Sequence, residues 1–348
     1  MAMHFFLGAN SADGFVSLFP QLQKEEARPL YVLKGGPGCG KATCIRALSG
    51  ALGGVREYIR CCSDPDSLDG AVLETCAIVD GTVPHVQEPL FPGSDGDYLT
   101  LPPLLDREGL RQKAGALYAL KAASKAHYAG AYRLLAAAQK AREERRQQAA
   151  SLLTGDPAKR AAGLLQREVP RREGPARERR RFLEGIGPKG WVCLTDTVNG
   201  QFARVIGLRD GIGLGEGLLE ALRAGALERG QEVYACPDPL EPQRLRHLLL
   251  PGCSLAFVTL DGHPVPEAHR TIRIDSMLSA EGLRHNRARL RLLAKVEEEL
   301  LAEAVEHIAA AHALHDRMEA IYRPHVDIAA MEGWYRQLAA GITPSLSS

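Results

Sequence analysis

A glycine-rich segment with one lysine is the part of this sequence best suited to hold phosphate. It reads GGPGCGKAT and comprises Gly35, Gly36, Pro37, Gly38, Cys39, Gly40, Lys41, Ala42 and Thr43. The spacing G-x-x-x-x-G-K is typical of loops whose backbone N–H groups, together with the dipole of the following helix, attract phosphate. The Lys41 ammonium would reach the outer phosphates. We therefore predict that this loop binds a nucleoside triphosphate.

The residue after Lys41 departs from the usual Walker A pattern, which has serine or threonine at that position. The missing hydroxyl normally ligates Mg²⁺, and the metal bridges the β- and γ-phosphates. Ala42 cannot provide this hydroxyl, and Thr43 lies about 100° further around a helix axis. The sequence thus predicts nucleotide binding but leaves hydrolysis open.

Acidic and histidine side chains downstream could complete a catalytic site with Lys41. Asp80 closes the apolar run CAIVD, where such proteins place an acid next to Mg²⁺, so it is the candidate metal residue. No glutamate follows it directly, and a water-orienting group must come from elsewhere. His85 and Glu88 are candidates because they are near in sequence. For His85, a structural role is equally open.

Three further aspartates, Asp64, Asp66 and Asp69, follow a predicted strand and are expected at the carboxyl edge of a sheet, where open α/β folds bind ligands. Helix capping explains each of them as well. Eight cysteines occur without a C-x-x-C pair, and the adjacent Cys61 and Cys62 cannot bridge each other without strain. Reduced, buried thiols are predicted, and the spacing does not indicate a zinc site.

The order of apolar runs predicts an α/β fold. Leu30–Leu33 reads as a strand that leads into the glycine-rich loop, and Ile45, Leu48 and Leu52 then fall at helical spacing. Residues 56–62 and 76–80 read as further strands. Short strands that alternate with helices predict a parallel sheet covered on both faces.

Two long proline-free segments, Leu104–Asp156 and Ala268–Arg323, read as helical arms. One apolar face is predicted from residues spaced by three or four, namely Leu293, Val296, Leu300, Ala304 and Ile308. An unbroken helix of this length would be unusually long, so we predict a helical hairpin that turns near Gly130. Such arms pack on the body of the protein or on a protein partner.

The chain contains an internal repeat. Four collinear blocks match later blocks at offsets of 176, 175, 174 and 173 residues; the first three begin at Phe5, Leu30 and Cys62, and the fourth ends at Ala138. The repeat predicts an N-terminal unit with its arm over residues 1–166 and a second unit with its arm over residues 181–348. Residues 167–180 have an arginine-rich composition, which predicts an exposed linker.

The second copy has lost the residues that would hold phosphate. In the repeat alignment Gly35 is replaced by Asp210 and Lys41 by Glu216, and Gly217 stands where Ala42 does. Thr259 takes the place of Asp80. Two added carboxylates would repel a triphosphate, so the second loop is predicted to bind no nucleotide.

Composition restricts the class of protein. Apolar residues make up 45% of the 348 residues, and the formal net charge is +1, which is too balanced for binding nucleic acid or anionic membranes through net charge. No stretch reaches the roughly 18 apolar residues of a membrane span, and the start lacks the pattern of a signal peptide. A soluble, cytoplasmic protein is expected.

The ordered motifs FFLGANSADGF, LKGGPGCGK, CCSDPDSLDG, AIVDGTVPHVQEP and AYRLLAAA, in a duplicated layout, resemble an uncharacterised family of bacterial P-loop ATPase-like proteins with two tandem units. The resemblance covers nearly the whole chain. It implies ATP as the nucleotide, with Lys41 on the phosphates and Asp80 near Mg²⁺. Both units of that family commonly carry a GKS or GKST loop, from which this sequence departs at Ala42 and in its second loop.

Three functions are compatible with these features. The first is ATP binding, with slow hydrolysis, at a single N-terminal site. The second is a nucleoside or nucleotide kinase in which Asp64 or Asp66 positions an acceptor hydroxyl. The third is a non-catalytic nucleotide switch whose helical arms bind another protein, a function that Ala42 favours.

Overall fold

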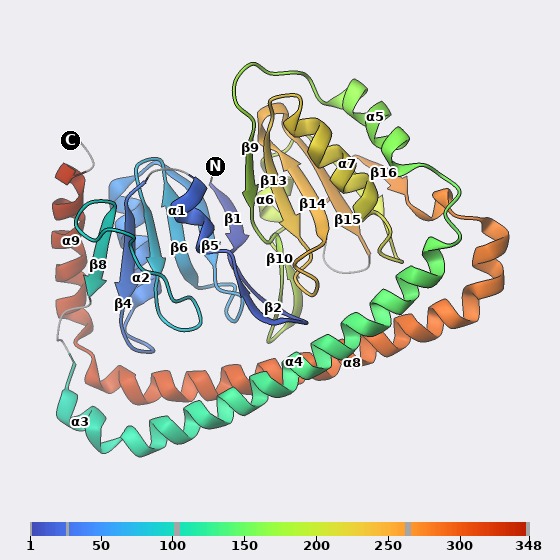
Figure 1. The fold of residues 1–348 in the computed structure, drawn as a ribbon. Helices are drawn as coiled ribbons and strands as arrows, with labels where there is room; N and C mark the ends of the chain where they lie inside the picture. Colours follow the sequence, from blue (N-terminus) through green and yellow to red (C-terminus); the bar gives the residue numbers. More distant parts are fainter. Residues whose placement is uncertain (1, 26–27, 101–104, 262–265, 346–348) are drawn as a thin grey trace. The chain divides into compact units, whose positions relative to one another are not determined.

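The computed structural model describes residues 2–25, 28–100, 105–261 and 266–345 (Figure 1). It is a mixed α/β structure with two compact units. Unit 1 comprises Met1–Gly8, Ser17–Gly130 and Glu306–Ser348, and unit 2 comprises Ala9–Val16 and Ala131–Val305. The boundaries between these units differ from those expected at residues 166 and 181. Each long helix begins in one unit and ends in the other.

Unit 1 is built on a six-stranded sheet. Its strands, in spatial order, are β1 (Met3–Phe6), β5 (Val55–Arg60), β6 (Leu68–Leu73), β7 (Ala77–Asp80), β4 (Leu30–Lys34) and β8 (Gly96–Thr100). The predicted strands β4, β5 and β7 are confirmed. The predicted parallel sheet is found only in part, since β1–β5, β7–β4 and β4–β8 pair in parallel but β6 runs antiparallel to β5 and to β7. The connections on either side of β6 are too short for the crossover that a parallel strand needs.

Unit 2 contains a sheet of the same topology. Its strands, in the corresponding order, are β9 (Arg177–Arg180), β13 (Glu232–Pro237), β14 (Leu245–Leu250), β15 (Leu255–Leu260), β12 (Arg204–Arg209) and β16 (Arg270–Arg273). As in unit 1, the third strand is antiparallel to its neighbours. The two sheets therefore share the strand order that an internal repeat predicts.

Other elements recur at nearly constant offsets. Helices α2 (Lys41–Leu52) and α7 (Glu216–Leu227) begin 175 residues apart, and the hairpins β2–β3 (Gly8–Ser11, Gly14–Ser17) and β10–β11 (Glu184–Gly187, Gly190–Cys193) begin 176 residues apart. One predicted block was misaligned by three residues. Strand register pairs Arg60 with Leu68 and Pro237 with Leu245, which makes Cys61 correspond to Asp238.

Short helices cover the sheets within each unit. In unit 1, Ile45 and Leu48 of α2 are fully buried, and α9 (Ile328–Ser345) packs against α2. In unit 2, α7 packs on the sheet and α5 (Pro157–Glu168) packs on α7. The remaining short elements are α1 (Gln21–Glu25), α3 (Arg107–Gln112), α6 (Asp196–Asn199) and the 3₁₀ turns η1 (Pro251–Cys253), η2 (Asp275–Met277) and η3 (Arg323–His325).

The predicted helical arms are the unbroken helices α4 (Ala114–Ala150) and α8 (Ala280–Tyr322), so the prediction of a turn near Gly130 is wrong (Figure 1). A Cβ at Gly130 would lie 2.8 Å from the His307 ring, which shows that glycine there permits close approach of α8. Leu104, the predicted start of the first arm, lies outside the described residues. No helix in the described ranges has an apolar stretch long enough to cross a bilayer.

The predicted apolar face of α8 is only partly confirmed. Ala304 and Ile308 are fully buried, but Val296 is 41% exposed. Leu293 and Leu300, the other predicted members, are half-buried. Glu297 is buried instead, because two arginines of α4 pair with its carboxylate.

The arginine-rich segment is a linker over only part of its length. Residues 171–178 are exposed, as predicted. Arg177–Arg180, however, form the edge strand β9, which pairs in parallel with β13. An edge strand needs partners on one side only, and Arg179 is held by Glu232 at 2.9 Å.

Candidate functional site

The predicted strand, loop and helix around the glycine-rich segment are present. The loop leaves β4 after Lys34, and α2 begins at Lys41. Gly38 and Gly40 have φ angles of +66° and +75°, in the left-handed region that favours glycine. The first N–H groups of α2 therefore follow a loop whose conformation depends on these two glycines.

Lys41 and Asp80 are brought together beside this loop. The Lys41 Nζ donates to the carbonyl oxygens of Gly36 at 2.9 Å and Gly35 at 3.3 Å, and it lies 3.6 Å from Asp80 Oδ2. Asp80 Oδ1 accepts from the backbone N–H and the hydroxyl of Thr82, at 2.8 and 2.7 Å. One carboxylate oxygen of Asp80 is thus fixed by Thr82, and the other faces the lysine.

Three side chains from the last two helices lie on the loop. Glu319 Oε1 accepts the Gly38 N–H at 3.2 Å, and the Tyr335 hydroxyl donates to the Gly40 carbonyl at 3.0 Å. A Cβ at Gly36 would lie 2.7 Å from the Tyr322 ring. The sequence did not predict these contacts, and no local spacing connects residue 319 with residue 38.

The charge of Glu319 is stabilised where it lies. A hydrogen bond from His315 is the main reason that the pKa of Glu319 falls below its ordinary value, and burial opposes this effect. The Gly38 N–H and the charge of Lys41 lower it further. A carboxylate anion therefore occupies one N–H of the glycine-rich loop.

His85 pairs with Asp69, and both side chains are buried. His85 Nε2 lies 3.0 Å from Asp69 Oδ2. Burial alone would lower the pKa of His85, but the charge and hydrogen bond of Asp69 outweigh it and raise the pKa overall. The charges of Asp80 and Lys41 also act on His85. The Cys61 sulfur lies near the pair, and the three potential ligand atoms are all within 4.8 Å of one another.

The other acidic candidates have contacts of their own. The Lys34 Nζ lies 2.9 Å from Glu88 Oε1, and hydrogen bonds from Tyr98 and Lys34 lower the pKa of this exposed glutamate. Asp64 accepts the Asp66 N–H within the turn between β5 and β6. Within the described part of the chain, Glu88 has no contact with Lys41 or Asp80 that would support the predicted catalytic role.

The corresponding loop of unit 2 is closed by its own aspartate. Asp210 Oδ1 accepts the N–H groups of Gly213 at 3.0 Å and Leu214 at 2.9 Å, and Oδ2 accepts that of Gly215 at 2.6 Å. Glu216, at the position of Lys41, forms an ion pair with Arg244. An internal carboxylate thus satisfies the N–H groups that a phosphate would need.

Buried ion pairs fill the sheet edge of unit 2. Arg246 corresponds to Asp69 by strand register, and it pairs with Glu184, with Asp261 at 2.7 Å and with Asp238 at 3.4 Å. Asp238 also pairs with Arg142 at 2.9 Å. The two sheets therefore share strand order while their edges have different chemistry.

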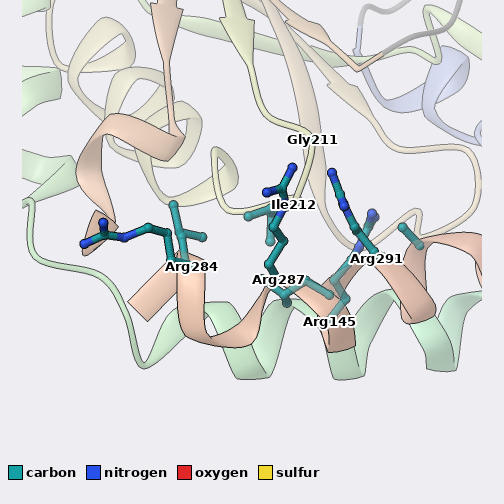
Figure 2. A pocket seen from close by; sticks show the side chains of 9 residues that line it. Arg145, Gly211, Ile212, Arg284, Arg287 and Arg291 are labelled. Atoms are coloured by element: carbon teal, nitrogen blue, oxygen red, sulfur yellow. The ribbon is translucent and has the colours of Figure 1, made fainter. Parts of the chain in front are cut away.

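Arginines from the long helices line a cavity of about 420 Å³ in unit 2. Figure 2 shows Arg287 and Arg291 pointing toward Gly211 and Ile212 of the second loop, whereas Arg284 points away. None of these three arginines forms an ion pair within the described residues. Positive charge near the second loop is thus supplied by a helical arm rather than by a loop lysine.

Comparison with known proteins adds no relative. No family model matches the chain, and neither a curated protein nor a solved structure matches it. The resemblance to P-loop ATPase-like proteins stays a prediction.

Proposed function

We propose that unit 1 binds ATP through Gly35–Thr43, with Lys41 on the outer phosphates. The main support for this proposal is the hydrogen bond of 3.2 Å that the Gly38 N–H donates to the Glu319 carboxylate. A loop that already holds one anion on a backbone N–H has the kind of donor and the positive charge that a phosphate needs. The closed second loop argues for one site per chain. Titration calorimetry of the full chain with ATP tests this stoichiometry.

The residues around the loop do not provide the usual magnesium site. Ala42 has no hydroxyl, and the Thr43 side chain is exposed. Asp80 offers only the oxygen that faces Lys41, because Thr82 holds the other. Nucleotide binding is therefore the main activity in this proposal, and hydrolysis is slow, below the roughly 1–10³ s⁻¹ common among enzymes.

A nucleotide-dependent switch is the second candidate, and the contacts of Glu319 and Tyr322 favour it. Both residues belong to the end of α8, and both lie where phosphates would approach the loop. ATP would have to displace Glu319 before its phosphates could reach the Gly38 N–H. Binding energy would then be coupled to a movement of the C-terminal helices, which could expose a surface for a protein partner. Among the residues that the structure describes, no contact specifically favours the kinase alternative.

Glu319→Gln is expected to increase ATP affinity by roughly five- to tenfold, because the amide keeps the acceptor but loses the charge, and charged hydrogen bonds are worth about 1–1.5 kcal/mol more than neutral ones. Calorimetry at constant ionic strength would measure the ATP affinity of each variant. Glu299→Gln is the matched control, since Glu299 is an exposed glutamate on the same helix. Equal affinities for the two variants would show that Glu319 does not compete with phosphate.

Ala42→Ser is expected to increase both the Mg²⁺ dependence of ATP binding and the rate of phosphate release, because it restores the missing metal ligand with little added volume. Ala47→Ser, at an exposed position of α2, controls for a serine in the same helix. Phosphate release over hours, with and without Mg²⁺, provides the measurement. If the unaltered chain already hydrolyses several ATP molecules per second and Ala42→Ser changes nothing, Mg²⁺ is held in another way.

A further inference from the structure

We propose that Cys61, Asp69 and His85 of unit 1 form a binding site for one Zn²⁺ ion. Their potential ligand atoms, a thiol sulfur, a carboxylate oxygen and an imidazole nitrogen, lie within 4.8 Å of one another. Sulfur, oxygen and nitrogen donors of these kinds are the usual protein ligands of zinc. Asp69 and His85 are buried, and Cys61 is half-buried.

The spacing of the three atoms is close to that of a tetrahedral site. Zinc bonds of about 2.0–2.3 Å place neighbouring ligand atoms roughly 3.3–3.7 Å apart. His85 and Asp69 are already 3.0 Å apart. Binding therefore requires the Cys61 sulfur to shift by at most about 1 Å, which a rotation of about 30° about its χ1 bond can supply.

The strand arrangement explains why these distant residues meet. Cys61 follows the end of β5, Asp69 is the second residue of β6, and β6 pairs with β5 from Leu68 onward. Because β6 is antiparallel, its start lies at the edge where β5 and β7 end. The pairing of Gly70 with Val79 puts Asp69 level with Asp80, and His85 follows in the loop after β7.

Unit 2 provides an internal comparison for this cluster. At the corresponding positions Cys61 is replaced by Asp238 and Asp69 by Arg246, and these two side chains form an ion pair. Arginine remains charged and does not ligate metals. The same strand order thus forms without metal ligands of this kind at these two positions, so Cys61 and Asp69 are not requirements of this sheet. We therefore expect one Zn²⁺ ion per chain rather than two.

Three protein ligands leave one position for water or for an oxygen of a bound ligand, as in catalytic zinc sites. Asp69 is level with Asp80, whose carboxylate lies 3.6 Å from the Lys41 Nζ, so the metal site lies near the glycine-rich loop. The zinc proposal does not depend on ATP binding, and each can fail without the other.

Metal content tests the proposal directly. The full chain is stripped with a chelator, equilibrated with Zn²⁺ and freed of excess metal, and one equivalent is expected to remain. Co²⁺ in its place should give thiolate-to-metal absorption in the near ultraviolet and tetrahedral bands in the visible. Cys61→Ser, Asp69→Asn and His85→Gln should each weaken Zn²⁺ binding by more than the roughly 10–100-fold typical of losing an outer hydrogen-bond partner.

Cys62→Ser is the matched control, since Cys62 is the adjacent thiol but lies outside the cluster. It should retain the metal and the cobalt spectrum. Retention of Zn²⁺ by Cys61→Ser together with its loss from Cys62→Ser would overturn the assignment, and so would a metal content that no variant changes. Circular dichroism checks that each variant is folded.

A second measurement uses the unaltered chain. Zn²⁺ is expected to slow alkylation of Cys61 by N-ethylmaleimide at least several-fold, while Mg²⁺ should have no effect because it does not bind thiolates. Peptide mapping by mass spectrometry distinguishes Cys61 from Cys62. Equal alkylation of Cys61 with and without Zn²⁺ would contradict the proposed site.

Discussion

Replacing Lys41 by alanine is expected to weaken ATP binding by roughly tenfold to a hundredfold, because charge-assisted hydrogen bonds to phosphate contribute about 1.5–3 kcal/mol each. Lys41 is the one cationic side chain within the glycine-rich segment. Calorimetric titration of the folded variant with ATP measures the loss. Lys125→Ala, at an exposed site on α4, is the control and should keep the original affinity.

An ATP affinity unchanged by Lys41→Ala would remove the N-terminal loop from the proposed function. The second loop offers the reverse experiment. Glu216→Lys restores a lysine there, but the Asp210 carboxylate still occupies three N–H groups of that loop. The variant is therefore expected to bind one ATP per chain, as before, and a second equivalent would show that Asp210 does not close the loop.

Replacing Glu297 by alanine is expected to destabilise unit 2 by about 3–5 kcal/mol, because one partner of a buried ion pair leaves the other uncompensated. The Glu297 carboxylate pairs with Arg142 at 2.6 Å and with Arg145 at 2.8 Å. Its removal would leave two guanidinium groups without this partner. Urea unfolding gives the change in free energy of unfolding.

The chain offers a way to observe unit 2 alone. It has two tryptophans, and in a Trp334→Phe background the fluorescence reports on Trp191, whose ring lies 5.6 Å from the Arg142 guanidinium. Glu299→Ala, at an exposed position of α8, should change stability by less than about 0.5 kcal/mol. If Glu297→Ala lowers the free energy of unfolding by less than about 1 kcal/mol, this result would contradict the stabilising role proposed for the ion pairs of Glu297.

The parts of the fold that were predictable are those with local signals. The glycine-rich loop, the start of α2 at Lys41 and the strands β4, β5 and β7 follow from turn residues and hydrophobic periodicity over short windows. The repeat was also visible, since matching blocks keep a nearly constant offset. Strand β6 was missed because its type and direction depend on short connections to its neighbours.

Contacts between distant segments were not predictable. Gly130 was interpreted as a turn, but it allows close packing against His307, which is far away in the sequence. Val296 was predicted to be buried, yet the partner arginines of α4 favour Glu297 at that face. The Cys61 cluster has no characteristic spacing, because its members come from the end of β5, from β6 and from the loop after β7. Likewise, Glu319 reaches Gly38 only through the tertiary structure.

Hydrogen exchange of the full chain, measured by mass spectrometry with and without ATP, tests the central claim most directly. ATP is expected to slow exchange in residues 35–43, because their N–H groups would bind phosphate. Exchange in residues 210–217 should stay unchanged, and residues 315–322 should exchange faster once Glu319 is displaced. Unchanged exchange in residues 35–43 at saturating ATP, or protection of residues 210–217 instead, would contradict the proposal that unit 1 holds the nucleotide site.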